Sequence, residues 1–325
     1  MTGKKIQTSG AEPKPVKSAR GMDPEIAVTP LADVALADPP RVSRRFFLNV
    51  AFAALASYAI GIEPEQLTLR RVEIPLLDLP EALDGLRIGQ LSDLHRCPVM
   101  PRWRVEQAIS LMADASPDLV TLTGDYVSYW PDYAAEYPEL LASLKPRLGC
   151  FACTGNHDHW TDPDVVTDAL READVIVLRN RHQIIPVGGA QLCIVGIDDV
   201  GLAGISMHHA NPADDLPAAL AGSPLSGVTR LLLAHNPDFV MEPVFAQETT
   251  QRPIHLVLSG HTHGGQVRLP VLGAPFLPSR HGQLFGGGLV QAADTHVYVS
   301  RGVGSSLPVR FNCPPEISVL TLRRA

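Results

Sequence analysis

The chain has 325 residues, of which 45% are hydrophobic and 19% charged, and its formal net charge is -7 at pH 7. This is an ordinary globular composition, and the length allows one large domain with extensions. The acidic balance would repel a phosphate backbone, and no long block of lysine and arginine offsets it, so nucleic acid is not expected as a partner.

The N-terminal region differs from the rest of the chain. Residues 1–40 are rich in Pro, Ala, Lys and Asp without sustained periodicity, which predicts a disordered tail. In residues 41–62, Arg44 and Arg45 precede an apolar stretch from Phe46 to Ile62, a pattern typical of an export signal or a membrane anchor, with a buried core helix as the alternative. The arginine pair before Phe-Phe-Leu resembles the twin-arginine signal, which hands folded proteins to the twin-arginine export machinery. We therefore expect the domain at 63–325 to be exported through, or anchored to, the inner membrane and to lie in the periplasm or outside the cytoplasm.

From about residue 67, apolar runs alternate with segments of helical periodicity. Strands are predicted at 86–93, 118–125 and 149–156, and helices at 102–115, 132–144 and 162–173. A hairpin is predicted around Gly188 and Gly189, then a loop with a short helix over 201–220, then strands at 230–236, 254–261, 296–300 and 316–322. This order predicts an α/β fold with a largely parallel, buried sheet and some mixed strands later.

The five cysteines cannot all pair within one chain. Cys150 and Cys153 form a C-x-x-C, but they lie in a predicted strand, where residues i and i+3 face opposite sides. We expect them to be small buried hydrophobes rather than a redox or zinc motif.

Residue types that ligate metals follow five successive apolar runs. They are Asp93 and His95, then Asp125, then Asn156 with His157 and Asp158, then His235, and last His261 and His263. Any one of them could be a turn cap, an Asx turn or a loop histidine. Because ligands gather at the carboxyl ends of strands in open α/β sheets, the full series predicts one common site.

The residue types also indicate the kind of site. Carboxylate, amide and imidazole ligands without thiolate suit divalent Mn, Fe or Zn. Seven ligands are too many for one such ion and about right for two, and paired ions about 3.5 to 4 Å apart are the usual device for displacement at phosphorus. The pattern therefore predicts a dinuclear phosphoesterase.

The series DLH, GDYV, GNHD, AHNPD and GHTHGG resembles the calcineurin-like metallophosphoesterase superfamily from about residue 85 to the C-terminus. The resemblance implies a sandwich of two mixed β-sheets flanked by helices. It implies a first metal held by Asp93, His95 and His263, a second held by Asn156, His235 and His261, and a bridge from Asp125. It also implies that His157 faces the scissile phosphate and is oriented by Asp158.

A finer resemblance rests on the arginine pair with GDYVS, GNHDHW and RFNCPPEI. These motifs are similar to an exported or membrane-associated bacterial branch that includes UDP-2,3-diacylglucosamine diphosphatases of lipid A biosynthesis, which implies a phosphorylated small-molecule or lipid substrate. His208 and His209 are expected to be exposed loop histidines. Two alternatives stay open: a nuclease or phosphodiesterase of the same superfamily, which should show a basic groove or a capping domain, and a non-catalytic, metal-stabilised binding protein of the envelope.

Overall fold

The computed structural model describes residues 43–199, 214–292 and 295–325. The predicted tail at 1–40 and the two histidines His208 and His209 lie outside the described residues. Residue contacts gather Leu48–Ala325 into one compact unit, which includes the whole of the predicted domain at 63–325.

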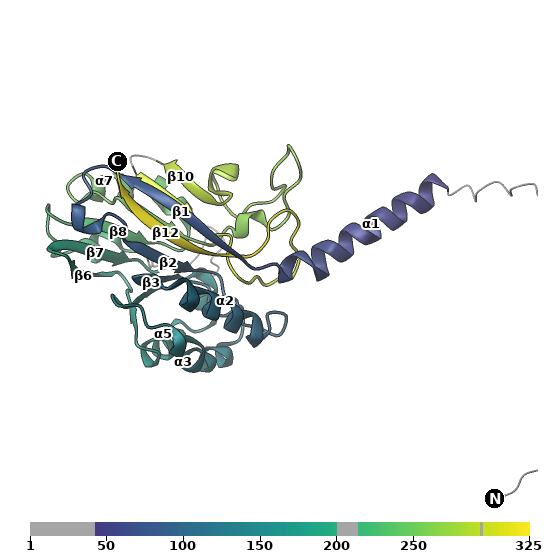
Figure 1. The fold of residues 1–325 in the computed structure, drawn as a ribbon, viewed down its shortest axis with the longest axis horizontal. Helices are drawn as coiled ribbons and strands as arrows, with labels where there is room; N and C mark the ends of the chain where they lie inside the picture. Colours follow the sequence, from purple (N-terminus) through teal and green to yellow (C-terminus); the bar gives the residue numbers. More distant parts are fainter. Residues whose placement is uncertain (1–42, 200–213, 293–294) are drawn as a thin grey trace, which may run out of the picture. The chain divides into compact units, whose positions relative to one another are not determined.

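Within the described residues, two six-stranded mixed sheets pack face to face, as the resemblance implied (Figure 1). The first sheet has the order β1 (Thr68–Leu76), β12 (Glu316–Arg324), β2 (Arg87–Leu91), β3 (Leu119–Thr123), β4 (Cys150–Cys153) and β5 (Val175–Val177). The second has the order β10 (Gly288–Ala292), β11 (Thr295–Val299), β9 (Leu256–Ser259), β8 (Thr229–Leu233), β7 (Ala190–Gly196) and β6 (Arg181–Val187).

Parallel pairing dominates the centre of each sheet. Strands β2 to β5 are parallel neighbours, and so are β7, β8, β9 and β11. Antiparallel pairs join β12 to β2, β6 to β7 and β10 to β11. The predicted hairpin is confirmed: β6 and β7 are joined by Gly188 and Gly189, whose φ angles of 55° and 91° are the positive values that a tight two-residue turn needs.

Apolar side chains fill three layers. Leu119 of β3 lies between the sheets with Leu231 and Leu256, whereas Val120 and Leu122 face the helices outside the first sheet. A third layer lies on the outer face of the second sheet. Since both faces of the central strands are covered, these strands are continuous apolar runs without alternation.

Seven α-helices are described: α1 (Arg44–Gly61), α2 (Arg102–Ala115), α3 (Tyr137–Leu140), α4 (Asn156–Thr161), α5 (Pro163–Glu172), α6 (Leu216–Leu220) and α7 (Pro243–Thr249). Short 3₁₀ helices are η1 (Glu63–Glu65), η2 (Glu81–Leu83), η3 (Pro131–Glu136), η4 (Leu141–Ser143), η5 (Pro237–Met241), η6 (His263–Gly265) and η7 (Gly282–Phe285). The single helix predicted at 132–144 is wrong, because η3, α3 and η4 share this segment. Pro138 lies in its middle and cannot donate the backbone hydrogen bond that a continuous helix requires.

Two further predictions, one for the cysteines and one for the apolar N-terminal segment, can be compared with the structure. All five cysteines are buried and unpaired, which confirms that Cys150 and Cys153 act as small hydrophobes in β4. The segment Arg44–Glu65 is long and apolar enough to cross a membrane, a property that export signals share. Its side chains are mostly exposed to solvent, which argues against the alternative of a core helix.

Candidate metal centre

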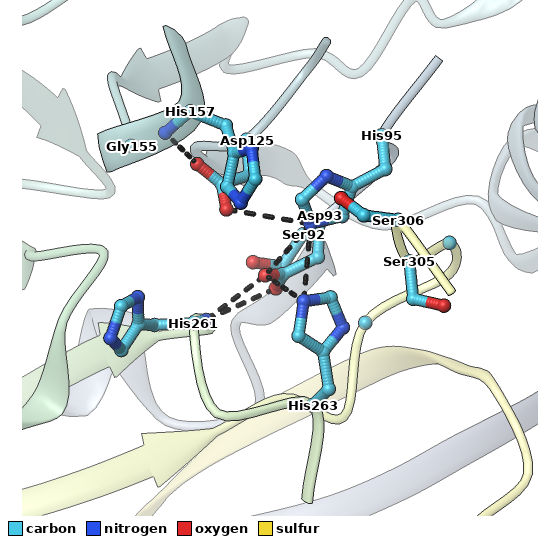
Figure 2. A network of polar contacts seen from close by, with 12 residues as sticks. Ser92, Asp93, His95, Asp125, Gly155, His157, His261, His263, Ser305 and Ser306 are labelled. Atoms are coloured by element: carbon cyan, nitrogen blue, oxygen red, sulfur yellow. Dashed lines mark hydrogen bonds and ion pairs between the residues drawn. The ribbon is translucent and has the colours of Figure 1, made fainter. Parts of the chain in front are cut away.

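The structure brings all seven predicted ligands together where five strands end. Strand β2 leads to Asp93 and His95, β3 to Asp125, β4 to Asn156, β8 to His235, and β9 to His261 and His263. Figure 2 shows Asp93, His95, Asp125 and His263 pointing toward one another, with His261 on the far side of Asp93. The ligands come from both sheets, so the packing of the sheets is what assembles the site.

One group of four side chains surrounds a single point. Nε2 of His95 lies 3.1 Å from Nε2 of His263 and 3.9 Å from Oδ1 of Asp93. Nε2 of His263 is 3.4 Å from the same Asp93 oxygen, and Nε2 of His95 is 3.4 Å from Oδ2 of Asp125. Atoms bound about 2.1 Å from one ion stand about 3.0 to 3.4 Å apart, so three of these four distances are those of atoms sharing a cation, and the fourth, 3.9 Å, is somewhat longer.

A second group lies on the other side of Asp125. Nε2 of His235 is 3.2 Å from Oδ2 of Asp125, and Nδ1 of His261 is 2.8 Å from Oδ1 of Asn156. Oδ2 of Asp125 therefore faces imidazoles of both groups.

Five of the seven predicted ligands have a left-handed backbone. Their φ angles lie between 49° and 69°, and the five are Asp93, His95, Asp125, His261 and His263. Residues other than glycine rarely adopt this conformation, and such local strain clusters at functional sites. Gly260 allows the turn before His261, because a Cβ there would collide with Ser92 and Asp93.

The protonation of three of the four candidate histidine ligands suits cation binding; in the fourth, His235, burial opposes the charged form, but Asp125 raises the pKa well above its usual value. Burial lowers the pKa of His95 and of His261 to about 3, and it holds the pKa of His263 well below its usual value. These imidazoles are therefore neutral at pH 7 and keep a lone pair for a metal. Burial opposes ionisation of Asp125, but His235 and His157 hold the pKa of its carboxyl well below the usual range.

Neighbouring groups fix the rings of two ligands. Nδ1 of His235 lies 2.6 Å from the carbonyl oxygen of Thr123, and Nδ1 of His95 lies 3.1 Å from Oγ of Ser128. A hydrogen bond donated from Nδ1 leaves Nε2 as the ligand atom, which is the usual arrangement around metal-bound histidines.

His157 is oriented differently from what the resemblance implied. Its Nδ1 lies 2.9 Å from the carbonyl oxygen of Ser128, and its backbone N–H donates to Oδ1 of Asp125 at 2.8 Å. The carboxylate of Asp158 instead accepts hydrogen bonds from the backbone N–H groups of Asp125, Tyr126 and Gly155 at 2.8 to 2.9 Å. Asp158 therefore holds the turns that carry the ligands, whereas Ser128 holds the ring of His157.

Sequence reasoning missed two residues of the site. Asp199 lies within 4.8 Å of the ligand atoms of His235 and His261, close enough to share an ion with them. It follows β7, so the rule that located the other strand ends would have found it. Ser128 gave no such signal, because its contacts with His95 and His157 are made only in the folded chain.

The side chains fit divalent ions. Nε2 of His261 and Nδ1 of His263 are buried and have no hydrogen-bond partner among the described residues. Leaving such atoms unpaired costs free energy. In addition, Nε2 of His95 and Nε2 of His263 lie 3.1 Å apart, and two neutral imidazole nitrogens at this distance are stabilised by a cation near both. The donors are carboxylates, an amide and imidazoles, the set that borderline divalent metals prefer.

A cavity of about 280 Å³ opens over the site. Its floor includes Asp125, His157, His261 and His263. Its rim carries the half-exposed or exposed side chains of Tyr129, Trp160, Phe276 and Leu307. The cavity thus offers polar atoms at its base and aromatic and apolar surface at its mouth.

Comparison with known proteins identifies the family. Residues 86–265 match the model of the calcineurin-like phosphoesterase family. The phosphodiesterase YaeI of Escherichia coli (strain K12) is 34% identical over 86% of this chain and 99% of its own length. A transmembrane protein with a metallophosphoesterase domain from Danio rerio is 34% identical over 84% of this chain and 61% of its own length. The UDP-2,3-diacylglucosamine pyrophosphatase LpxG of Chlamydia muridarum (strain MoPn / Nigg) is 27% identical over 81% of this chain and 91% of its own.

The chain belongs to the calcineurin-like phosphoesterase family, and it is a metal-dependent phosphoester hydrolase. The fold and the cluster of aspartate and histidine side chains agree with this assignment.

Proposed function

We propose that the enzyme hydrolyses phosphate esters or pyrophosphates with two divalent ions, Mn, Fe or Zn. Asp93, His95 and His263 would hold the first ion, Asn156, His235 and His261 the second, and Asp125 both. The observation that carries the proposal is the position of Oδ2 of Asp125, which lies 3.4 Å from Nε2 of His95 and 3.2 Å from Nε2 of His235.

When bound, the ions would supply Lewis-acid catalysis and activate water for attack at phosphorus. His157 supplies what the ligands do not, because it lines the cavity without being needed to hold an ion. With Nδ1 hydrogen-bonded to the carbonyl of Ser128, Nε2 is the atom from which a protonated ring donates to the departing oxygen. Asp158 acts through the backbone, keeping Asp125 and the turn before Asn156 in place.

The cavity of 280 Å³ is the better entrance for the substrate. A larger cavity of about 660 Å³ lies beside His235, but its walls carry six carboxylates, Asp198, Asp199, Asp214, Asp215, Asp238 and Glu242, against one arginine, Arg280, and this excess of negative charge would repel a phosphate. The smaller cavity has an aromatic and apolar rim, which suits a lipid- or nucleotide-linked phosphate such as UDP-2,3-diacylglucosamine. The relative named for activity on that substrate supports this choice.

A screen of purified enzyme tests the proposal. Metal content is measured first, and initial rates are then compared on UDP-2,3-diacylglucosamine, bis(p-nitrophenyl) phosphate and single-stranded DNA. We expect two equivalents of metal and faster turnover of the pyrophosphate. Preferred cleavage of the diester would favour the second candidate, a phosphodiesterase like the relative YaeI, and cleavage of DNA would indicate a nuclease.

Asp199 is expected to strengthen binding of the second ion. Replacing Asp199 by Asn keeps the shape but removes a negative charge close to His235 and His261, so affinity for one of the two ions should fall by about 10- to 100-fold. Titration calorimetry of the metal-stripped protein measures the two affinities separately. The matched variant Asp198→Asn alters a neighbouring carboxylate bound to Thr154 and Arg179 and should leave both affinities unchanged. Equal affinities in wild type and Asp199→Asn would exclude Asp199 as a ligand.

The export route is also a proposal: Arg44 and Arg45 would direct the chain to the twin-arginine machinery. Replacing both by lysine keeps the charge but removes the guanidinium groups, so translocation should stop. Cell fractionation measures the result, and replacement of Arg70 and Arg71 by lysine in β1 is the control. If the double lysine variant at 44 and 45 is still exported, the segment is an ordinary anchor that relies on charge alone.

A further inference from the structure

A hairpin near the metal cavity exposes an uninterrupted apolar tip. Leu269, Pro270, Val271 and Leu272 are all exposed, Val271 completely and Leu272 to 75%. Runs of consecutive exposed apolar residues are avoided on soluble surfaces unless they have a function. We refer to residues 269–272 as the apolar tip.

The chain holds the apolar tip in a defined conformation. Leu269 and Gly273 exchange backbone hydrogen bonds of 2.8 and 3.0 Å, which closes the hairpin. Val271 has a φ of 69°, a strained value for a β-branched residue. The backbone is thus strained at a residue whose apolar side chain lies in solvent, which points to a partner that covers this side chain.

The base of this hairpin is joined to the end of α1. Backbone bonds of 2.8 Å connect Phe311 with Gln266 and Arg268, just before the apolar tip. The ring of Phe311 packs edge-on against Tyr58 of α1 at 6.4 Å, and the N–H of Arg310 donates to the carbonyl of Ala59 at 2.8 Å. The base of the hairpin that carries the tip is therefore joined to the end of a helix that is long and apolar enough to cross a membrane.

We propose that the apolar tip inserts into the surface of the lipid bilayer in which α1 is anchored. A lipid surface fits better than a protein, because four residues cover much less than the roughly 800 Å² per partner that stable protein interfaces bury. The shallow apolar boundary of a bilayer accepts such a tip, since leucine and valine gain free energy on leaving water.

Insertion would place the mouth of the cavity at the bilayer surface. Gln266 lines the cavity, directly precedes the hairpin, and donates from Nε2 to the carbonyl of Leu307 on the rim at 3.1 Å. The rim residues Phe276 and Leu307 are 74% and 67% exposed and continue the apolar surface toward the site. A phosphate carried by a membrane lipid would then reach the ligands without leaving the bilayer surface.

Fluorescence quenching in vesicles tests the insertion. The full chain with Leu272→Cys is labelled with an environment-sensitive dye and reconstituted in vesicles of phosphatidylethanolamine and phosphatidylglycerol that contain a nitroxide-labelled lipid. The native cysteines are buried, which favours labelling at the new site. The control is Leu77→Cys. Leu77 is as exposed as Leu272, but it follows the last residue of β1, about 30 Å along the strand from Thr68, where β1 begins after α1.

We expect a blue-shifted and quenched emission at position 272 and neither at position 77. Adding Val271→Asp should abolish the quenching at 272, because a carboxylate resists entry into the bilayer, and aspartate tolerates a positive φ without disturbing the fold. Equal quenching at both positions, no quenching at 272, or quenching that survives Val271→Asp would each overturn the proposal. Quenching requires no turnover, so its failure is distinct from failure of the proposed hydrolase activity.

Discussion

Replacing Asp125 with asparagine is expected to remove both divalent ions and most of the phosphoesterase activity. Oδ2 of Asp125 faces His95 and His235 at 3.4 and 3.2 Å, so one charge serves both groups of ligands. Asparagine keeps the volume and accepts the φ of 57° at this position, so the change tests charge rather than backbone strain. Activity should fall by more than about 10²-fold, a loss typical of removing one strong electrostatic contributor.

Elemental analysis and initial rates on a nitrophenyl ester measure the two effects of Asp125→Asn. The control Asp168→Asn changes an exposed carboxylate on α5 and should keep two equivalents of metal. Retention of both ions and full activity by Asp125→Asn would refute the shared position of Asp125.

Replacing His157 with asparagine is expected to leave both ions bound and to lower turnover by about 10² to 10⁴, the usual contribution of a general acid. His157 lines the cavity, but it is not needed to complete either group of ligands. The loss should be larger for an alkyl ester than for a nitrophenyl ester, because a nitrophenolate leaves without a proton.

The matched control for His157 is His182→Asn. Nδ1 of His182 also lies near a backbone carbonyl, that of Ala219 at 2.8 Å, but on β6, outside the cavity. The His182→Asn variant should change neither the metal content nor the rate of hydrolysis. Equal losses of His157→Asn on the two esters would indicate charge stabilisation in place of proton donation, and unchanged rates on both would remove His157 from the mechanism.

The candidate site was predictable because its proposed ligands follow local patterns. A buried strand appears as a short apolar run, and the residues just after it must leave the sheet, so polar ligand types at Asp93, Asp125 and His235 stand out. Asp199 obeys the same rule, since it follows β7 after Ile197 and Asp198. The sequence therefore contained the signal for Asp199, although the family motifs do not include it.

Contacts between distant segments were not predictable from local patterns. The pairing of β1 with β12 brings Thr68 opposite Glu316, and periodicity carries no information about such partners. The helix expected at 132–144 shows a similar limit, because its apolar spacing is helical while Pro138 interrupts the backbone hydrogen bonds.

The sequence by itself determined the family, the candidate ligands and the strands that carry them, because backbone preference and burial act over a few neighbouring residues. Only the tertiary structure decided that Ser128 orients His157, that Asp158 binds backbone N–H groups, and that Phe311 joins the base of the hairpin to the end of α1. These are side-chain and loop contacts between segments far apart in the chain. Their geometry depends on how the two sheets and the loops between them pack, and this packing is a property of the whole fold rather than of any short stretch of sequence.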